Sequence, residues 1–168
     1  MAILDILHYP DERLHLKASK VENFDANLSK IIDDMFETMY DSNGIGLAAI
    51  QVDIQKRIVV MDLSKKDYPM EKILLINPQI IEKNGTTEYE EGCLSVPGVY
   101  EKITRYETVT IEYQDISGNI LTRECDELLS ICVQHELDHL DGKVFVDYLS
   151  PLKQNFIKKK MKKLDRDR

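Results

Sequence analysis

The sequence of 168 residues predicts a single α+β domain, and three observations support this fold class. Short β-branched or aliphatic runs are interspersed with longer helical patterns. They do not alternate regularly, as the strand–helix–strand units of a parallel sheet would. No linker, repeat or low-complexity tract divides the chain, and its length is typical of one domain with its own core. We therefore expect residues 1–168 to form one domain.

The first helix is expected over residues 28–40, where apolar side chains recur at the spacing of one helical stripe. Asn43 and Gly44 follow it as a stop signal. Strands are expected at four β-branched or aliphatic runs, residues 57–62, 73–76, 108–113 and 120–123. Asn77 and Pro78 should end the second run, and the last two runs flank a turn and predict a hairpin.

A central helix is expected over residues 126–141, ending at Gly142. Its apolar residues lie nearly all round, which predicts a buried position. The last helix begins at Pro151 and forms a basic tail, because residues 153–168 contain eight basic and two acidic side chains. We expect this lysine-rich helix to pack through Phe156 and Ile157 and to expose its charges.

The composition excludes several classes of protein. Hydrophobic residues make up 43% and charged residues 31% of the chain, and the net charge is −8, which argues against general affinity for DNA. No apolar run is long enough to span a membrane, and the N-terminus is too acidic for a signal peptide. Cys93, Cys125 and Cys132 follow no disulfide spacing, so we expect a reducing, cytoplasmic location.

The central helix carries the motif His-Glu-X-X-His. His135 and His139 are four residues apart and therefore lie on one helical face, where both imidazoles can bind one metal ion. Glu136 is close enough to handle the proton of a metal-bound water. The alternative is a helix with two hydrogen-bonded core histidines.

Two histidines do not complete a catalytic site, since such metals usually take three protein ligands and one water. His8 and His15 lie in a polar N-terminal stretch, and Cys132 is better interpreted as a small core residue. Cys93 differs because it occupies a loop-like segment, residues 91–97, in which glycine permits close backbone approach and proline ends pairing.

Three segments stand in the order that is typical of bacterial peptide deformylases. They are GIGLAAIQ at residues 44–51, EGCLS at 91–95 and QHELDH at 134–139. The resemblance covers nearly the whole chain and is to the shorter, Gram-negative-like form of the family. It implies sheets, mixed or antiparallel, around the central motif helix.

The resemblance also implies one divalent metal ion, ferrous iron in the usual cellular form, with zinc, nickel or cobalt as alternatives. Cys93 would be the third ligand beside His135 and His139, leaving the fourth position for water. The substrate would be a newly made peptide that begins with N-formylmethionine, and formate would be released.

Further roles follow from the resemblance. The Leu94 backbone N–H and the Gln51 side-chain amide would stabilise the oxyanion, and Glu136 would carry the proton. The Gly46 carbonyl would accept from the formamide N–H of the substrate. The residues alone indicate that Gln51 is a hydrogen-bonded core amide, and that Gly44 and Gly46 are turn residues with positive φ.

Ile45, Leu128 and Cys132 are expected to line a pocket for the methionine side chain, although each alone would be interpreted as core. Tyr100 stands where many relatives of this form carry arginine, a departure that concerns contacts with the peptide beyond methionine. Glu91 is either a solvated carboxylate or a buried one that holds Arg105 and thereby orients the Cys93 loop.

Rival interpretations remain open at this point. A peptide-bond metalloprotease shares the histidine motif, and a non-catalytic metal-binding protein could keep the fold. Glu136 and Gln51 argue against the second, because a structural metal needs neither a proton carrier nor an oxyanion donor. The basic tail could also dock on ribosomal RNA, as the role of the family suggests.

Overall fold

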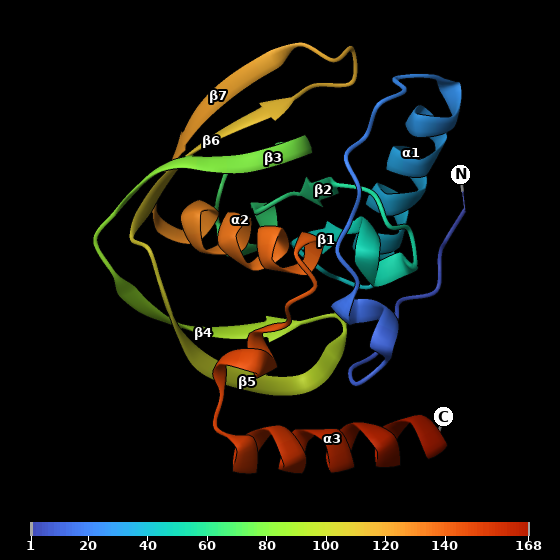
Figure 1. The fold of residues 1–168 in the computed structure, drawn as a ribbon, viewed down its shortest axis with the longest axis vertical. Helices are drawn as coiled ribbons and strands as arrows, with labels where there is room; N and C mark the ends of the chain where they lie inside the picture. The colour runs from blue at the N-terminus through green and yellow to red at the C-terminus, as the bar shows by residue number, and fades with distance from the viewer. Residues whose placement is uncertain (1, 168) are drawn as a thin grey trace.

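The computed structural model describes residues 2–167 and arranges them around one central helix (Figure 1). That helix, α2 (Glu127–Leu140), carries both histidines of the motif. Helix α1 (Ala26–Asp41) lies beside the larger sheet, and helix α3 (Pro151–Arg166) lies beyond the smaller sheet (Figure 1). Four short 3-10 helices connect these elements: Glu12–His15, Ala49–Val52, Ser64–Lys66 and Phe145–Tyr148.

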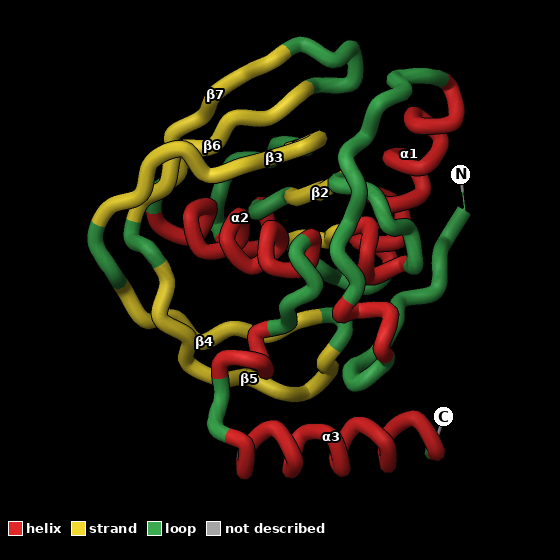
Figure 2. The backbone as a smooth tube through the Cα atoms, in the orientation of Figure 1, coloured by secondary structure: helices red, strands yellow, loops and turns green. Residues whose placement is uncertain are grey.

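Two antiparallel sheets enclose α2, as the tube in Figure 2 shows. The larger has the order β1-β2-β3-β6-β7, and the smaller pairs β4 with β5. The strands are β1 (Gly46–Ala48), β2 (Ile58–Met61), β3 (Ile73–Asn84), β4 (Thr87–Cys93), β5 (Val96–Arg105), β6 (Thr108–Gln114) and β7 (Ile120–Cys125). The predicted α+β class is confirmed.

Apolar periodicity and helix-end signals in the sequence predicted the helices well. Asp25 caps α1 by accepting from the Leu28 N–H at 2.9 Å, and the stripe of this helix is buried through residues such as Met35 and Met39. Every residue of α2 except Glu127, Leu129 and Asp138 is buried. In residues 2–167, none of the helices combines the length and the apolar character needed to cross a membrane.

The prediction that a strand ends at Asn77 and Pro78 is wrong, because β3 continues to Asn84. The register against β6 shifts between Ile76 and Gln79, and Asn77 adopts a left-handed φ of 51°. At such a bulge the missing N–H of proline removes no ladder hydrogen bond. The Asn77 side chain instead binds the backbone of Val21, which ties the N-terminal segment to the sheet.

Residues 91–97 form the tip of a β-hairpin rather than the expected loop. Cys93 ends β4 and pairs with Val96, and Pro97 lies inside β5. In the described part of the chain, β4 and β5 pair only with each other, so proline is tolerated on this edge. The hairpin fixes the position of Cys93 more firmly than a loop would.

Helix α3 packs through Ile157 and Met161, which are one turn apart and buried. The prediction that Phe156 also packs is wrong, since its side chain is 70% exposed. Consecutive helical residues point about 100° apart, so Phe156 leaves the inner face that Ile157 occupies.

Candidate metal centre

Cys93, His135 and His139 converge on one point between β4 and α2. The Cys93 Sγ lies 3.4 Å from His139 Nε2, and the two Nε2 atoms are 3.2 Å apart. All three ligand atoms lie within 4.8 Å of one another. Metal bonds of about 2.0–2.3 Å place tetrahedral ligands roughly 3.3–3.7 Å apart, so the donor set fits an ion.

Both imidazoles are buried, and the histidine geometry comes from the helix itself. Burial holds the pKa of His139 well below its ordinary value, so this ring stays neutral, which is the ligating form. Burial also lowers the pKa of His135, but the contacts with Cys93 and Glu91 outweigh it and raise that pKa. Bonding to a metal requires that Nε2 of each ring be unprotonated.

Glu91 supports His135 at Nδ1, the ring nitrogen that is not directed at Cys93 and His139. His135 Nδ1 lies 2.9 Å from Glu91 Oε1, and Arg105 donates to both carboxylate oxygens at 2.6 and 2.8 Å. Burial raises the pKa of Glu91, but these partners outweigh it and lower that pKa. An ionised Glu91 accepts from the Nδ1–H and leaves Nε2 facing Cys93 and His139. The buried Glu91–Arg105 pair is confirmed, and through Glu91 it orients His135.

Glu136 is buried beside the ligands. Burial raises its pKa to about 7, which suits a group that takes and gives a proton near neutrality. Within residues 2–167, its Oε1 has no hydrogen-bond partner. An orphaned buried oxygen beside a set of ligands is a group aimed at something that binds there.

Gly44 and Gly46 line the pocket and allow side chains to lie close to the backbone; neither forms a left-handed turn. The prediction of positive φ at Gly44 and Gly46 is wrong, because Asn43 takes that conformation with φ of 57°. A Cβ at position 44 would lie 2.6 Å from Leu94 Cδ1, and one at position 46 would collide with Glu136 Oε2. Glycine is needed here because side chains occupy the space.

Gln51 is buried, with its amide fixed at both ends. Its Oε1 accepts from the Ala48 N–H at 2.9 Å, and its Nε2 lies 3.1 Å from Ser95 Oγ and 3.5 Å from Cys93 Sγ. The N–H side of the amide therefore faces the candidate centre. Ser95 was missed by sequence reasoning, although its position in the EGCLS segment was a signal; its own N–H also contacts the Cys93 Sγ at 3.4 Å.

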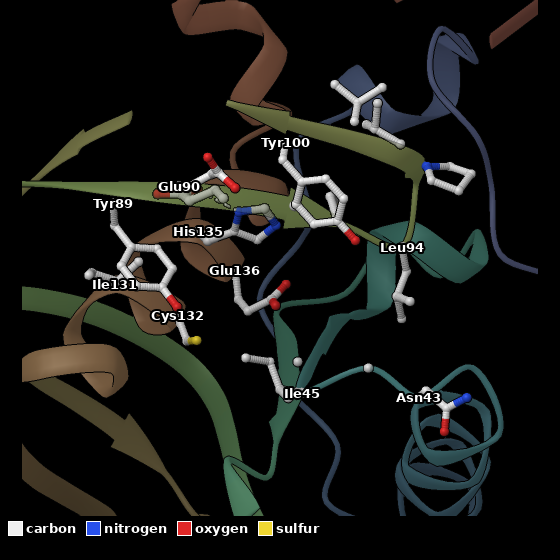
Figure 3. Close-up of a pocket in the computed structure, with 18 of the residues that line it drawn as sticks. Asn43, Ile45, Tyr89, Glu90, Leu94, Tyr100, Ile131, Cys132, His135 and Glu136 are labelled. Carbon is white, nitrogen blue, oxygen red and sulfur yellow. Dashed lines mark hydrogen bonds and ion pairs between the residues drawn. The ribbon is translucent and has the colours of Figure 1, made fainter. Parts of the chain in front are cut away.

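A pocket of about 480 Å³ opens in front of these residues. Figure 3 shows Glu136, Ile45, Leu94 and Tyr100 around the same space. The predicted site residues that line it are Ile45, Gly46, Gln51, Cys93, Leu94, Leu128, Cys132, His135 and Glu136. His139 completes the set from within the core, where its side chain is fully buried.

An α+β domain with a Cys–His–His group beside a buried glutamate has the form of a metallohydrolase. The model of the family "Polypeptide deformylase" matches residues 3–155. Peptide deformylases of Chromobacterium violaceum and Neisseria meningitidis serogroup C are each 59% identical to the chain. The match to the Chromobacterium enzyme covers 99% of this chain and 98% of that protein. The match to the Neisseria enzyme covers 97% of this chain and 96% of that protein.

Solved structures agree with the sequence relatives. The peptide deformylase of Legionella pneumophila superposes with a TM-score of 0.92 at 46% identity, covering 98% of this chain and 96% of that one. The Ehrlichia chaffeensis enzyme in complex with actinonin gives 0.93 at 41% identity, covering 99% of each chain. The chain belongs to the polypeptide deformylase family and is a metal-dependent hydrolase.

Proposed function

We propose that this chain removes the formyl group from the N-terminus of formylmethionyl peptides of newly made proteins and releases formate. The observation that carries the proposal is that Cys93, His135 and His139 form one group of soft and borderline ligands, and that Cys93, His135 and Glu136 line the same pocket. The family and the actinonin-bound neighbour support the same activity.

Cys93, His135 and His139 would hold one divalent ion, and we propose ferrous iron in the cell, with zinc, nickel or cobalt as substitutes. A thiolate with two imidazoles suits any of these ions, and the choice depends on availability. Bound there, the ion supplies a Lewis acid and lowers the pKa of a water molecule.

Glu136 is proposed as the proton carrier. Its carboxylate takes a proton from the attacking water, whose oxygen bonds to the formyl carbon, and delivers that proton to the amine nitrogen when the C–N bond breaks. The pKa of about 7 serves both directions of this transfer. One water is consumed, and formate and a free amino terminus are formed.

Negative charge develops on the formyl oxygen during attack, and two donors are proposed to stabilise it. The Gln51 amide is already fixed by Ala48, so no reorganisation is needed when charge appears. The Leu94 N–H belongs to the tight turn of the β4–β5 hairpin beside Cys93. The Gly46 carbonyl would accept from the formamide N–H, because no side chain at position 46 keeps substrate away.

The methionine side chain is proposed to enter the apolar part of the pocket, between Ile45, Leu128 and Cys132. Ile131 lines the same region and extends the predicted set. Tyr100 lies at the pocket with its side chain 64% exposed, and its ring packs on Gly92, where a Cβ would lie 2.6 Å from Tyr100 Cε1. Residues after methionine would meet this ring.

One experiment tests the activity against its rivals. Metal-loaded protein is incubated with formyl-Met-Ala-Ser and with unformylated peptides, and formate and internal cleavage are measured. We expect formate from the formylated peptide, and a loss of about 10²–10⁴-fold in Glu136→Ala, since the proton carrier is removed. Internal cleavage without formate would favour a protease, and neither product would favour a binding protein.

We also propose that α3 docks on ribosomal RNA. Its outer face exposes lysines together with Leu152 and Phe156, which are 81% and 70% exposed. In Figure 1 this helix lies at one end of the molecule, on the outer side of the smaller sheet. Ribosome pelleting at increasing salt tests the proposal, because phosphate contacts weaken as salt rises.

The docking test needs variants that leave the core intact. Lys159, Lys162 and Lys163 are exposed on α3, and replacing all three by glutamate should abolish pelleting. Lys17, Lys20 and Lys56 are exposed elsewhere and serve as the matched control when all three are replaced by glutamate. Equal pelleting of both variants would contradict docking through α3.

A further inference from the structure

A chain of hydrogen bonds runs from the metal-ligating ring of His135 to the surface behind α2. Its first link joins His135 Nδ1 to Glu91 at 2.9 Å, and its second is the two-fold contact of Glu91 with Arg105. Glu91 and Arg105 are 3% and 6% exposed, so water does not substitute for these partners. The orientation of His135 therefore depends on where Arg105 is held.

Arg105 is held in turn by Asp138, which belongs to α2. Arg105 Nη1 donates to Asp138 Oδ2 at 2.6 Å, so the three nitrogens of the guanidinium all have carboxylate partners. Such a fork is rigid because its donors are coplanar. Any rotation of Asp138 would thus displace Arg105 and the Glu91 carboxylate with it.

Tyr148 is the last residue in this series of hydrogen bonds and lies at the surface. Its hydroxyl donates to Asp138 Oδ2 at 2.8 Å, and its ring lies 5.3 Å from the Arg105 guanidinium carbon. Burial and the charge of Asp138 raise the pKa of Tyr148 to about 12, so the hydroxyl keeps its proton and remains a donor. Tyr148 therefore contacts both members of the Asp138–Arg105 pair.

The position of this cluster separates it from the substrate pocket. Arg105, Asp138 and Tyr148 line a second pocket of about 520 Å³, which shares no lining residue with the first among the described residues. Tyr148 is 51% exposed and ends the 3-10 helix that leads into α3. A change at Tyr148 can thus reach His135 without touching the substrate.

We propose that Tyr148 is a positioning residue for the metal centre. Its hydroxyl fixes Asp138, and the resulting chain of hydrogen bonds fixes the ring of His135. The inference rests on the metal centre of the proposed function. Its consequence is that metal affinity and the Nδ1–H of His135 respond to a hydroxyl group that lies outside the substrate pocket.

Tyr148→Phe tests this directly, because it removes the hydroxyl and keeps the ring over Arg105. Asp138→Asn is the second variant, which keeps the side-chain shape and removes the charge. Tyr68→Phe is the matched control. Tyr68 donates to the Glu127 carboxylate at 3.1 Å and does not take part in the hydrogen bonds that link Tyr148, Asp138, Arg105, Glu91 and His135. The readouts are zinc affinity by chelator competition and the His135 Nδ1–H signal in ¹⁵N-histidine NMR.

Loss of a direct partner of a metal-bound histidine costs about 10–100-fold in affinity. The Tyr148 hydroxyl stands further out, so we expect zinc binding to weaken about three- to tenfold in Tyr148→Phe, and more in Asp138→Asn. The Nδ1–H signal should move upfield and exchange faster in both. With formylated peptide, kcat should fall while KM stays unchanged. Tyr68→Phe should match the unmodified protein in every readout.

Unchanged zinc affinity and an unchanged Nδ1–H signal in Tyr148→Phe and Asp138→Asn would overturn the inference. A fall in thermal stability without these changes would also overturn it, since that is what a purely structural role gives. If the unmodified protein binds no zinc, the proposed metal centre fails first. The Nδ1–H signal of the metal-free protein then still decides whether Tyr148 positions His135.

Discussion

A Cβ at Gly46 would collide with the carboxylate oxygen Oε2 of Glu136. The first strand of the larger sheet and the motif helix therefore touch at the Glu136 carboxylate, the proposed proton carrier. Because β1 contributes only backbone here, Glu136 can lie against the sheet, and its other oxygen, Oε1, has no hydrogen-bond partner among the described residues. This contact explains why residue 46 has no side chain.

Gly46→Ala should displace Glu136 and lower kcat by about 100-fold, at the lower end of what a proton carrier contributes. Zinc content should stay unchanged, because the ligands are not touched. Gly44→Ala is the matched control, since the three atoms nearest to its methyl group would all belong to the Leu94 side chain and none to Glu136. Equal losses in the two variants, measured with formyl-Met-Ala-Ser, would contradict the assignment of the contact.

Glu91→Gln should destabilise the protein by about 3–5 kcal/mol, because the buried Arg105 loses one of its two carboxylate partners and keeps only Asp138. The control is Glu101→Gln, whose Lys153 partner is 59% exposed, and here we expect less than about 1 kcal/mol. Urea unfolding of both metal-free variants gives the comparison. Similar losses of unfolding free energy in the two variants would show that burial does not make the Glu91–Arg105 pair more important for stability than an exposed pair.

Stability should fall in acid partly through Asp62. Burial raises the pKa of Asp62, but the Ser64 N–H and the Tyr40 hydroxyl outweigh it and lower that pKa below 3.8. The unfolded chain therefore binds the proton first as pH falls, so this contribution is complete well above 3.8 and is lost as pH falls through the folded-state value.

Tyr40→Phe removes one of those donors and should cost about 1.5–3 kcal/mol at pH 6, where Asp62 is ionised. The difference in unfolding free energy between Tyr40→Phe and the unmodified protein should become smaller below pH 3.8, where Asp62 is protonated in the unfolded state. Urea titrations at pH 6 and pH 3 measure it. An equal difference at both values would mean that the Tyr40 contact does not depend on the charge of Asp62.

Metal removal should lower thermal stability. An ion that binds the folded protein at 100 times its dissociation constant adds about 2.7 kcal/mol, and a chelator should remove this increment. Cys93→Ser provides the control, since loss of the thiolate should weaken zinc binding and shrink the chelator effect. A melting temperature that is insensitive to chelator in zinc-loaded protein would contradict a metal at this place.

Local periodicity in the sequence determined the helices of this protein and the position of His135 and His139 on one face of the same helix. Both depend on neighbours within one turn of helix, so the residue spacing is sufficient. The β6–β7 hairpin was predictable for the same reason, because its turn and its alternation are close in sequence. The order of three short segments indicated the family, which the relatives then confirmed.

Only the tertiary structure decided what lies beside those histidines. Cys93 reaches His139 across 46 residues of sequence, and the place of that contact depends on the β4–β5 hairpin, which local patterns did not predict. The same holds for Pro78 inside β3 and for the outward position of Phe156. Spacing within one element fixes which residues share a face, whereas contacts between distant segments depend on how the elements pack.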